Sequence, residues 1–210
     1  MDWIRFCHRL PRAVAHCGAV LCLALMSDAQ ADEGWAAARQ VAGVPVESRP
    51  TDSGFHEHRG AIAVCTDLDG LESFVADTSQ FADWIPFTRS VELLSSSEND
   101  FVYYVRSTTP WPLNDRDMVY RVTRGPTTNE GLKLSMVGLP DYQHPAQNAT
   151  RLVAAEGQWR LWPAADVINV EYQLYVHPGG VPAFAANRRL ATVVGRTLAN
   201  LAARFPCTTS

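Results

Sequence analysis

Few side chains in the sequence are spaced as catalytic groups or metal ligands usually are. His56 and His58 lie two residues apart in a segment with a strand pattern, so both imidazole rings would project from one face. A zinc site needs a third ligand and none is apparent, so we interpret the pair as facing solvent. Asp67 and Asp69 precede a helical apolar pattern, and we interpret them as a helix N-cap, because a calcium loop would need further oxygen ligands.

The sequence also argues against several classes of function. It contains no Gly-x-Ser-x-Gly, no His-Glu-x-x-His and no phosphate-binding loop, so we predict a binding protein that uses no cofactor or metal and is not an enzyme. The formal charge is −4, and residues 1–31 contribute three Arg and two Asp, which leaves the rest near −5. Without clustered basic charge, a nucleic-acid partner is not expected.

Six segments in the middle of the chain have the pattern of β-strands. They are separated by peptides rich in Ser, Asn, Asp, Pro and Gly, which favour turns. The predicted strands span residues 90–96, 101–108, 117–124, 131–138, 151–162 and 167–176. Alternate positions in three of them are apolar, namely Phe101, Tyr103 and Val105, then Met118, Tyr120 and Val122, then Leu132, Leu134 and Met136. Each of these strands has one dry face, and on the second strand Asp117 and Arg121 lie on the opposite face.

The last element is a long amphipathic helix over residues 181–204. Pro182 occupies a first-turn position, where proline is favoured. The apolar stripe of this helix is interrupted at Asn187 and Arg188 and consists of Phe184, Ala191, Val194, Leu198, Leu201 and Phe205. Such a stripe must cover an apolar surface, and the dry face of a long, curved antiparallel sheet is the natural partner. The sequence thus predicts an α+β fold.

The part of the chain before these strands is predicted to contain helices and one hairpin. Residues 35–42 are rich in alanine and follow two acidic residues, which favours a helix. Residues 44–46 and 55–64 have extended patterns on either side of a turn-rich peptide, as in a β-hairpin. Apolar residues at spacings of three and four then predict a helix over 68–77, and a further helical turn follows over 79–84.

Residues 1–31 have the three parts of a secretory signal peptide. Three arginines form a positive region, residues 13–26 form an apolar region, and residues 29–31 form a small-x-small cleavage site. The apolar region is too short to span a bilayer, which takes about 20 residues. We therefore expect a periplasmic or secreted protein whose mature domain spans residues 32–210.

Two cysteines, Cys65 and Cys207, would remain after cleavage of the signal. In an oxidising compartment they could pair and join the end of an apolar strand to the tail after the last helix. The alternative is a buried thiol together with a free thiol in the tail. The residues alone do not decide between the two.

Four motifs, in order, resemble those of the START lipid-transfer family. Residues 110–119, Pro-Trp-Pro-Leu-Asn-Asp-Arg-Asp-Met-Val, are similar to the family's Pro-aromatic-Pro loop followed by Arg-Asp and an apolar strand. Residues 157–161 resemble its Gly-x-aromatic strand, and residues 170–176 the strand after it. Residues 177–184 look like the Asp-Pro-Gly-Gly-x-Pro-x-aromatic peptide that leads into the family's last helix. The resemblance covers residues 32–205.

The resemblance implies a helix-grip fold, in which a curved antiparallel sheet wraps around the C-terminal helix and encloses a tunnel. The loop at residues 108–115 and that helix would form the mouth of the tunnel. Such a protein would act as a monomer, bind one lipid or other hydrophobic small molecule, and exchange it during transient contact with a membrane surface. We expect the helix or the loop to move during the exchange.

Two residues near this mouth each have two interpretations. Trp111 lies in a stiff, apolar loop, where an exposed indole would suit a membrane interface; alternatively, it folds back onto the core. Arg116 either holds a phosphate or carboxylate head group, or pairs with a local carboxylate and fixes the loop, with the second interpretation favoured.

One departure from the family narrows the expected ligand. Sterol-binding members are thought to have an acid and an arginine facing each other in the cavity, and by spacing those positions here hold Tyr103 and Val122. A ligand with a long acyl chain, or with a polar group met by the hydroxyl of Tyr103, Tyr120 or Tyr172, therefore fits better than a sterol held in that way. The candidate ligand-binding residues are Tyr103, Val105, Trp111, Arg116, Met118, Tyr120, Val122, Met136, Trp159, Tyr172, Leu174, Phe184, Val194 and Leu198.

Three functions follow from the resemblance. A lipid-binding or lipid-transfer protein is the first hypothesis. An enzyme is the second, because relatives of this fold act as polyketide cyclases and use a few polar cavity groups without a recognisable motif. A ligand-sensing module is the third. A cavity that contains an acid and a base with shifted pKa values would favour the enzyme.

Overall fold

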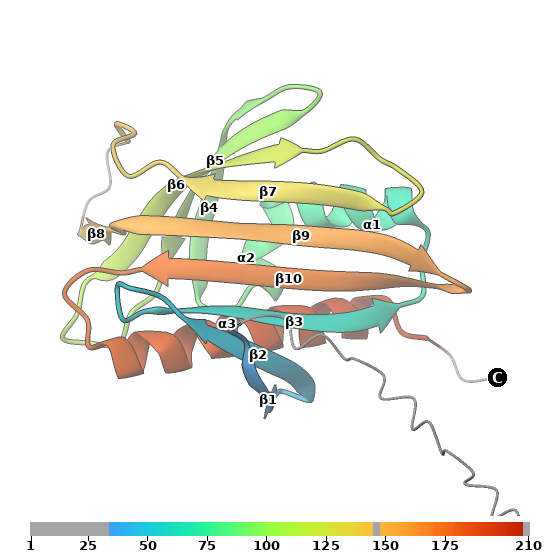
Figure 1. Cartoon of the computed structure of the whole chain (residues 1–210). Helices are drawn as coiled ribbons and strands as arrows, with labels where there is room; N and C mark the ends of the chain where they lie inside the picture. The colour runs from blue at the N-terminus through green and yellow to red at the C-terminus, as the bar shows by residue number, and fades with distance from the viewer. Residues whose placement is uncertain (1–33, 145–147, 208–210) are drawn as a thin grey trace, which may run out of the picture. The chain divides into compact units, whose positions relative to one another are not determined.

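The computed structural model describes residues 34–144 and 148–207, which form one open sheet and a long C-terminal helix (Figure 1). The strands are β1 (Ala36–Val41), β2 (Val44–Pro50), β3 (His56–Val64), β4 (Thr88–Ser96), β5 (Asp100–Ser107), β6 (Asp115–Arg124), β7 (Leu132–Gly138), β8 (Ala149–Arg151), β9 (Ala154–Ala164) and β10 (Val167–His177). The helices are α1 (Leu68–Ala76), the 3-10 turn η1 (Thr78–Gln80), α2 (Phe81–Trp84) and α3 (Ala183–Arg204). The expected signal peptide lies outside the described residues.

The order of strands in the sheet differs from their order in the sequence. Nine strands follow the order β1-β2-β3-β10-β9-β7-β6-β5-β4 with antiparallel neighbours, and β8 pairs in parallel with the start of β6. The helix α3 packs against β1, β2, β3 and β10, and Figure 1 shows it running along the same strands. This arrangement confirms the predicted α+β, helix-grip architecture, with an open sheet gripping one long helix.

The helix α1 forms where the sequence predicts it and begins at the expected cap. The amide nitrogen of Gly70 donates to Oδ1 of Asp67 over 2.7 Å, which satisfies one of the free N–H groups of the first turn. Leu71 and Val75, four residues apart, are buried on one face. The segment predicted as a second helical turn is divided between η1 and α2.

The helix predicted over residues 35–42 is wrong, because this segment forms the strand β1. Ala42 and Gly43 both have positive φ, at 53° and 82°, and form a two-residue turn that pairs Val41 with Val44. Positive φ at both turn positions matches the twist of antiparallel strands, so the hairpin outweighs the local helical preference of alanine. The hairpin between β2 and β3, in contrast, is confirmed.

The segment predicted as a single strand over residues 151–162 is divided between the strands β8 and β9. Around Asp117, the face of β6 that points away from α3 is also buried. Arg151 ends β8 and donates from Nη2 to Oδ2 of Asp117 over 3.2 Å. Asp117 is only 2% exposed and lies beside a small second core that includes Tyr104 and Val119. The loop before β9 therefore covers this face, which the alternation along β6 does not reveal.

The prediction that both histidines of β3 face solvent is also wrong. His56 is half-buried, whereas His58 is buried on the same strand face as Gly60, which α3 covers. Burial, and to a lesser extent the charge of His56, lowers the pKa of His58 from 6.5 to about 4. The imidazole of His58 is therefore part of the apolar packing and stays neutral at physiological pH.

The C-terminal half of α3 lies against the sheet at a distance that only glycine allows. Leu198 and Leu201 are fully buried in the main core. A Cβ at Gly60 would lie 2.9 Å from Cδ1 of Leu198, and a Cβ at Gly195 would lie 2.6 Å from Cβ of Val41. Both distances are too short for carbon atoms that are not bonded, so these glycines set how closely helix and sheet approach.

Polar bonds attach the N-terminal half of α3. Oδ1 of Asn187 accepts from the amide of His56 over 2.8 Å, and its Nδ2 donates to the carbonyl of Gly54 over 3.4 Å. These bonds explain the polar gap in the apolar stripe. Phe184, which the stripe also included, is 79% exposed, so the first turn of α3 lies outside the core.

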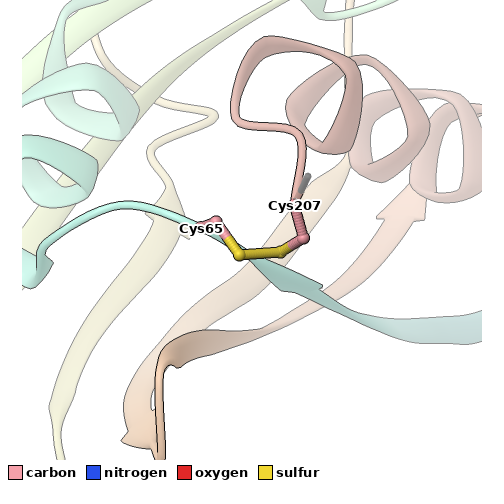
Figure 2. The surroundings of a disulfide bond; sticks show 2 residues. All are labelled: Cys65 and Cys207. Atoms are coloured by element: carbon pink, nitrogen blue, oxygen red, sulfur yellow. A yellow bond between two sulfur atoms is a disulfide. The ribbon is translucent and has the colours of Figure 1, made fainter. Parts of the chain in front are cut away.

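A disulfide bond between Cys65 and Cys207 joins the end of β3 to the residues after α3 (Figure 2). The two Cα atoms are 4.9 Å apart, and the amide of Cys65 donates to the carbonyl of Phe205 beside the bond. The two cysteines are therefore paired, which is one of the two alternatives that the sequence left open.

We expect the Cys207→Ser variant to lose about 2–5 kcal/mol of unfolding free energy, because the bond closes a loop with a sequence separation of 142 residues. Urea denaturation would measure this loss. A reductant should destabilise the unsubstituted protein by a similar amount and leave the variant unchanged. Equal stability of the two proteins would contradict a structural role for the disulfide.

We expect the stability of the protein to fall between pH 6.5 and pH 4 in a way that depends on His58. The unfolded chain binds a proton near pH 6.5, whereas the folded chain binds it only near pH 4, so acid favours unfolding across this interval. The loss is on the order of 3 kcal/mol. Denaturation at several pH values should show a shallower dependence for His58→Leu. Identical pH dependence in both proteins would refute this role of His58.

Candidate functional site

A cavity of about 460 Å³ lies between the sheet and the N-terminal half of α3. Its volume falls in the range of roughly 300–1,000 Å³ that is typical of small-molecule sites. The lining also includes residues between α2 and β4, together with the loop formed by residues 108–114, which we call the mouth loop. The predicted tunnel therefore corresponds to a real cavity, and the mouth loop lies at it as expected.

Alternate strand residues form the sheet side of the cavity. Tyr103 and Val105 of β5 line it, as do Tyr172 and Leu174 of β10, because residues two apart on a strand project from the same face. The opposite side comes from one face of α3. Ala185 and Ala186 are small and leave space there, whereas bulkier residues occupy the helix where it enters the core.

Three tyrosine side chains are among the polar residues on the sheet side, together with Thr88, Ser107 and Arg116. The rings of Tyr103 and Tyr120 stack with centroids 5.5 Å apart, and the hydroxyl of Tyr103 donates to Sδ of Met136 over 3.2 Å. Burial raises the pKa of Tyr103, Tyr120 and Tyr172, so all three phenols remain protonated. They can offer hydrogen bonds to a ligand but do not act as bases at neutral pH.

A second, much smaller cavity of about 30 Å³ lies beside the first. It is lined by Val122 and Trp159, and it shares Tyr103 and Tyr172 with the large cavity. The ring of Trp159 stacks on that of Tyr172 with centroids 4.0 Å apart. This inner space is large enough for about one water molecule and is bounded mainly by aromatic rings.

The structure brings most of the predicted ligand-binding residues together. Eight of them line the large cavity: Tyr103, Val105, Trp111, Arg116, Tyr120, Met136, Tyr172 and Leu174. Val122 and Trp159 line only the small one. Met118, Val194 and Leu198 are fully buried in the core and line neither cavity, and the exposed Phe184 lines neither. The last four therefore do not border a cavity, because an apolar pattern does not distinguish a side chain that faces an internal space from one that is packed or exposed.

The sequence interpretation missed several residues of the cavity. Arg189 and Val193 follow Ala185 at spacings of four and eight, so a helical-face count from Ala185 would have found them. Phe87 and Leu152 lie in irregular segments and carry no periodic signal. They reach the cavity only because the sheet brings distant loops together.

The indole of Trp111 points away from the core. It is 92% exposed, although Trp111 also borders the cavity, and Leu113 of the same loop is 42% exposed. The alternative in which Trp111 folds back onto the core is therefore wrong. The mouth loop therefore exposes apolar side chains at the rim of the cavity.

No carboxylate among the described residues pairs with Arg116, so the favoured interpretation of this residue is wrong. Its Nη1 donates to the carbonyl of Asn114 over 2.6 Å, and its Nε donates to the carbonyl of Pro178 over 3.3 Å. The neighbouring Asp115 instead binds Arg89 and Arg106, because adjacent residues of β6 project from opposite faces. The role of Arg116 in binding a head group stays a prediction.

Two further features bear on the kind of site. Within residues 34–144 and 148–207, no group of three His, Cys, Asp or Glu side chains is close enough together to hold a metal ion. In the same described ranges, no helix combines the length and the apolar character needed to cross a bilayer.

Comparison with known proteins identifies relatives that span most of the chain. A crystal structure of a StAR-related lipid transfer protein from Xanthomonas axonopodis is 30% identical, with a TM-score of 0.72, and the match covers 80% of this chain and 97% of that one. An uncharacterised protein of Pseudomonas aeruginosa is 28% identical over 172 residues, which are 80% of this chain and 85% of that protein. No protein-family model matches the sequence.

The structure of an enzyme is also similar to this chain, with a lower sequence identity and a lower TM-score. An aromatase/cyclase from a Streptomyces species is 19% identical, with a TM-score of 0.51, over 70% of this chain and 89% of its own. At this identity the likeness shows the shared fold alone.

Proposed function

Because the chain belongs to the StAR-related lipid transfer (START) family, we propose that it binds one lipid or other apolar small molecule in its cavity. The observation that carries this proposal is the cavity of about 460 Å³ between the sheet and α3. Aromatic and aliphatic side chains form most of its lining, with tyrosine hydroxyls among the few polar groups of the sheet side. This composition suits a ligand that is mostly hydrocarbon.

The energetics of lipid transfer favour such a cavity. Burial of a chain of about 16 methylene groups is worth about 13 kcal/mol at ~0.8 kcal/mol per group. A lipid therefore leaves a bilayer readily only for a site that is equally dry. The cavity walls of β5, β10 and α3 supply such a site, and the walls also need to open when the ligand enters or leaves.

We further propose that the protein is a monomeric carrier that loads and unloads at a membrane surface. Trp111 and Leu113 support this, because tryptophan is favoured at membrane interfaces and both side chains are exposed beside the cavity. Contact of the mouth loop with lipid would place the cavity where an acyl chain leaves the bilayer. This step is part of the proposal and rests on the position of the mouth loop.

A periplasmic or secreted location is also proposed. The signal-like pattern of residues 1–31 supports it, and so does the Cys65–Cys207 disulfide, because such bonds persist in oxidising compartments.

A polyketide-cyclase-like enzyme is the alternative function, favoured by the fold that the chain shares with the aromatase/cyclase. The cavity lining argues against it. Among the described residues that line the cavity there is no His, Asp, Glu, Lys or Cys, and its tyrosines are held neutral by burial. An acid and a base with complementary pKa values are thus not provided by these residues.

Native mass spectrometry of the mature protein from its own host tests the proposal directly. We expect a co-purified molecule of defined mass. In the Ala186→Phe variant the added ring should occupy the cavity and abolish this mass, whereas Ala203→Phe, on the exposed side of α3, should retain it. An empty protein that converts aromatic polyketides would instead support the enzyme.

The membrane step predicts a separate effect of Trp111→Ser. We expect transfer of a fluorescent lipid between vesicles to slow by about tenfold, a loss of ~1.4 kcal/mol of interfacial binding. Affinity in solution should change far less, because most of the indole surface faces away from the cavity. Leu93→Ser, at an exposed site on β4 outside the cavity lining, is the control. Unchanged transfer by the Trp111 variant would reject the role of the mouth loop.

A further inference from the structure

The charged side chains in the cavity lining are Arg116 and Arg189, and no carboxylate lines it among the described residues. Arg116 comes from the start of β6 and Arg189 from the second turn of α3, so two separate elements each place one cation at the same cavity. An apolar cavity with two positive charges and no negative charge in its lining attracts an anion.

Neither arginine has a carboxylate partner in the described part of the chain. Arg189 donates from Nη2 to the carbonyl of Thr108 in the mouth loop, and its guanidinium lies 3.8 Å from the centroid of the Phe87 ring. Burial lowers the pKa of Arg189, which reflects a cation removed from water without a compensating anion. The bonds of Arg116 go to two backbone carbonyls, one of them in the mouth loop.

Other partly buried arginines of this protein are neutralised. Arg106 pairs with Asp115, Arg124 with Glu72, and Arg151 with Asp117. A cation removed from water is costly unless it is paired, and these ion pairs follow that rule. Arg116 and Arg189 differ from them in having neutral acceptors.

We propose that Arg116 and Arg189 bind the anionic head group of an amphiphile, a carboxylate or phosphate, whose hydrocarbon part fills the cavity. This inference rests on the proposed function and specifies its ligand class. Hydrogen bonds between ionised groups are roughly twice as strong as bonds between neutral groups, so an anion is the favoured acceptor for the N–H groups that remain. The carbonyls keep both guanidinium groups at the mouth of the cavity, while Nη2 of Arg116 and Nη1 of Arg189 have no partner among the described residues.

Three ligands with the same twelve-carbon chain test the inference: dodecanoate, dodecyl phosphate and dodecanol. Their affinities for the mature protein would be measured at pH 8 by displacement of a neutral fluorescent probe. We expect both anions to bind at least tenfold more tightly than the alcohol. Acetate, which has the charge without the chain, should not displace the probe at the same concentrations, because the hydrocarbon supplies most of the binding energy.

Charge variants identify the residues responsible. Arg189→Gln and Arg116→Gln should each reduce the preference for the anions by at least fivefold and leave the affinity for dodecanol within about twofold. Arg189→Lys should keep part of the preference. Arg188→Gln is the matched control, because it removes the same charge from the adjacent, exposed position of α3 that does not line the cavity.

The outcomes separate this inference from the proposed function. Equal affinity for the alcohol and the anions, or an equal effect of the Arg188 and Arg189 variants, would overturn the head-group site while the cavity still binds hydrocarbon. Displacement by acetate would instead overturn the amphiphile as the ligand class, because the charge alone would then be sufficient for binding. If none of the three twelve-carbon ligands displaces the probe from the unsubstituted protein, the lipid-binding function itself is rejected as well. Unchanged dodecanol affinity in the Arg189 variant also confirms that the variant is folded.

Discussion

The close packing of the C-terminal half of α3 against the sheet is the constraint on which the rest of the structure depends. Gly60 and Gly195 remove the two side-chain carbons that would keep the helix away from β3 and β1. With the helix seated at this end, Leu198 and Leu201 complete the main core. On the N-terminal half of the same helix, alanine and aliphatic side chains face the cavity. One helix therefore closes the core at one end and forms the wall of a binding cavity at the other.

An internal space of this kind weakens a fold, because the atoms around it lose dispersion contacts that a packed interior would provide. The structure compensates outside the cavity. The main core is continuous around the buried part of α3, Asn200 donates to the carbonyl of Trp84, and the disulfide fixes the chain directly after the helix. Around the cavity itself the attachments are polar, through Asn187 and Arg189. The C-terminal half of α3 thus stabilises the fold, whereas its N-terminal half forms one wall of the cavity.

The sequence was sufficient to predict the sheet, the long helix and most of the residues on the cavity face. Period-two alternation identified Tyr103, Val105 and Tyr120, because strand geometry alone decides which face a residue occupies. It did not distinguish Tyr120, which lines the cavity, from Met118, which packs in the core two residues earlier, since that difference depends on which neighbouring side chains cover each residue. The helix predicted over residues 35–42 failed for a similar reason. Alanine favours a helix locally, whereas the turn at Ala42 and Gly43 and the pairing with β2 are decided by the hairpin. Arg189 was missed because an arginine in a helix is usually solvated, although its spacing from Ala185 places it on the helix face that borders the cavity.

The disulfide at one end of α3 also determines how the helix can move. The helix has 22 residues and is therefore about 33 Å long, so its first turn is roughly 30 Å from the covalent attachment at Cys207. A tilt of about 5° around that attachment would displace the first turn by about 2.5 Å and the buried residues near Leu201 by only a few tenths of an ångström. The covalent attachment therefore restrains the C-terminal end of α3 most strongly and its first turn, which borders the cavity, least.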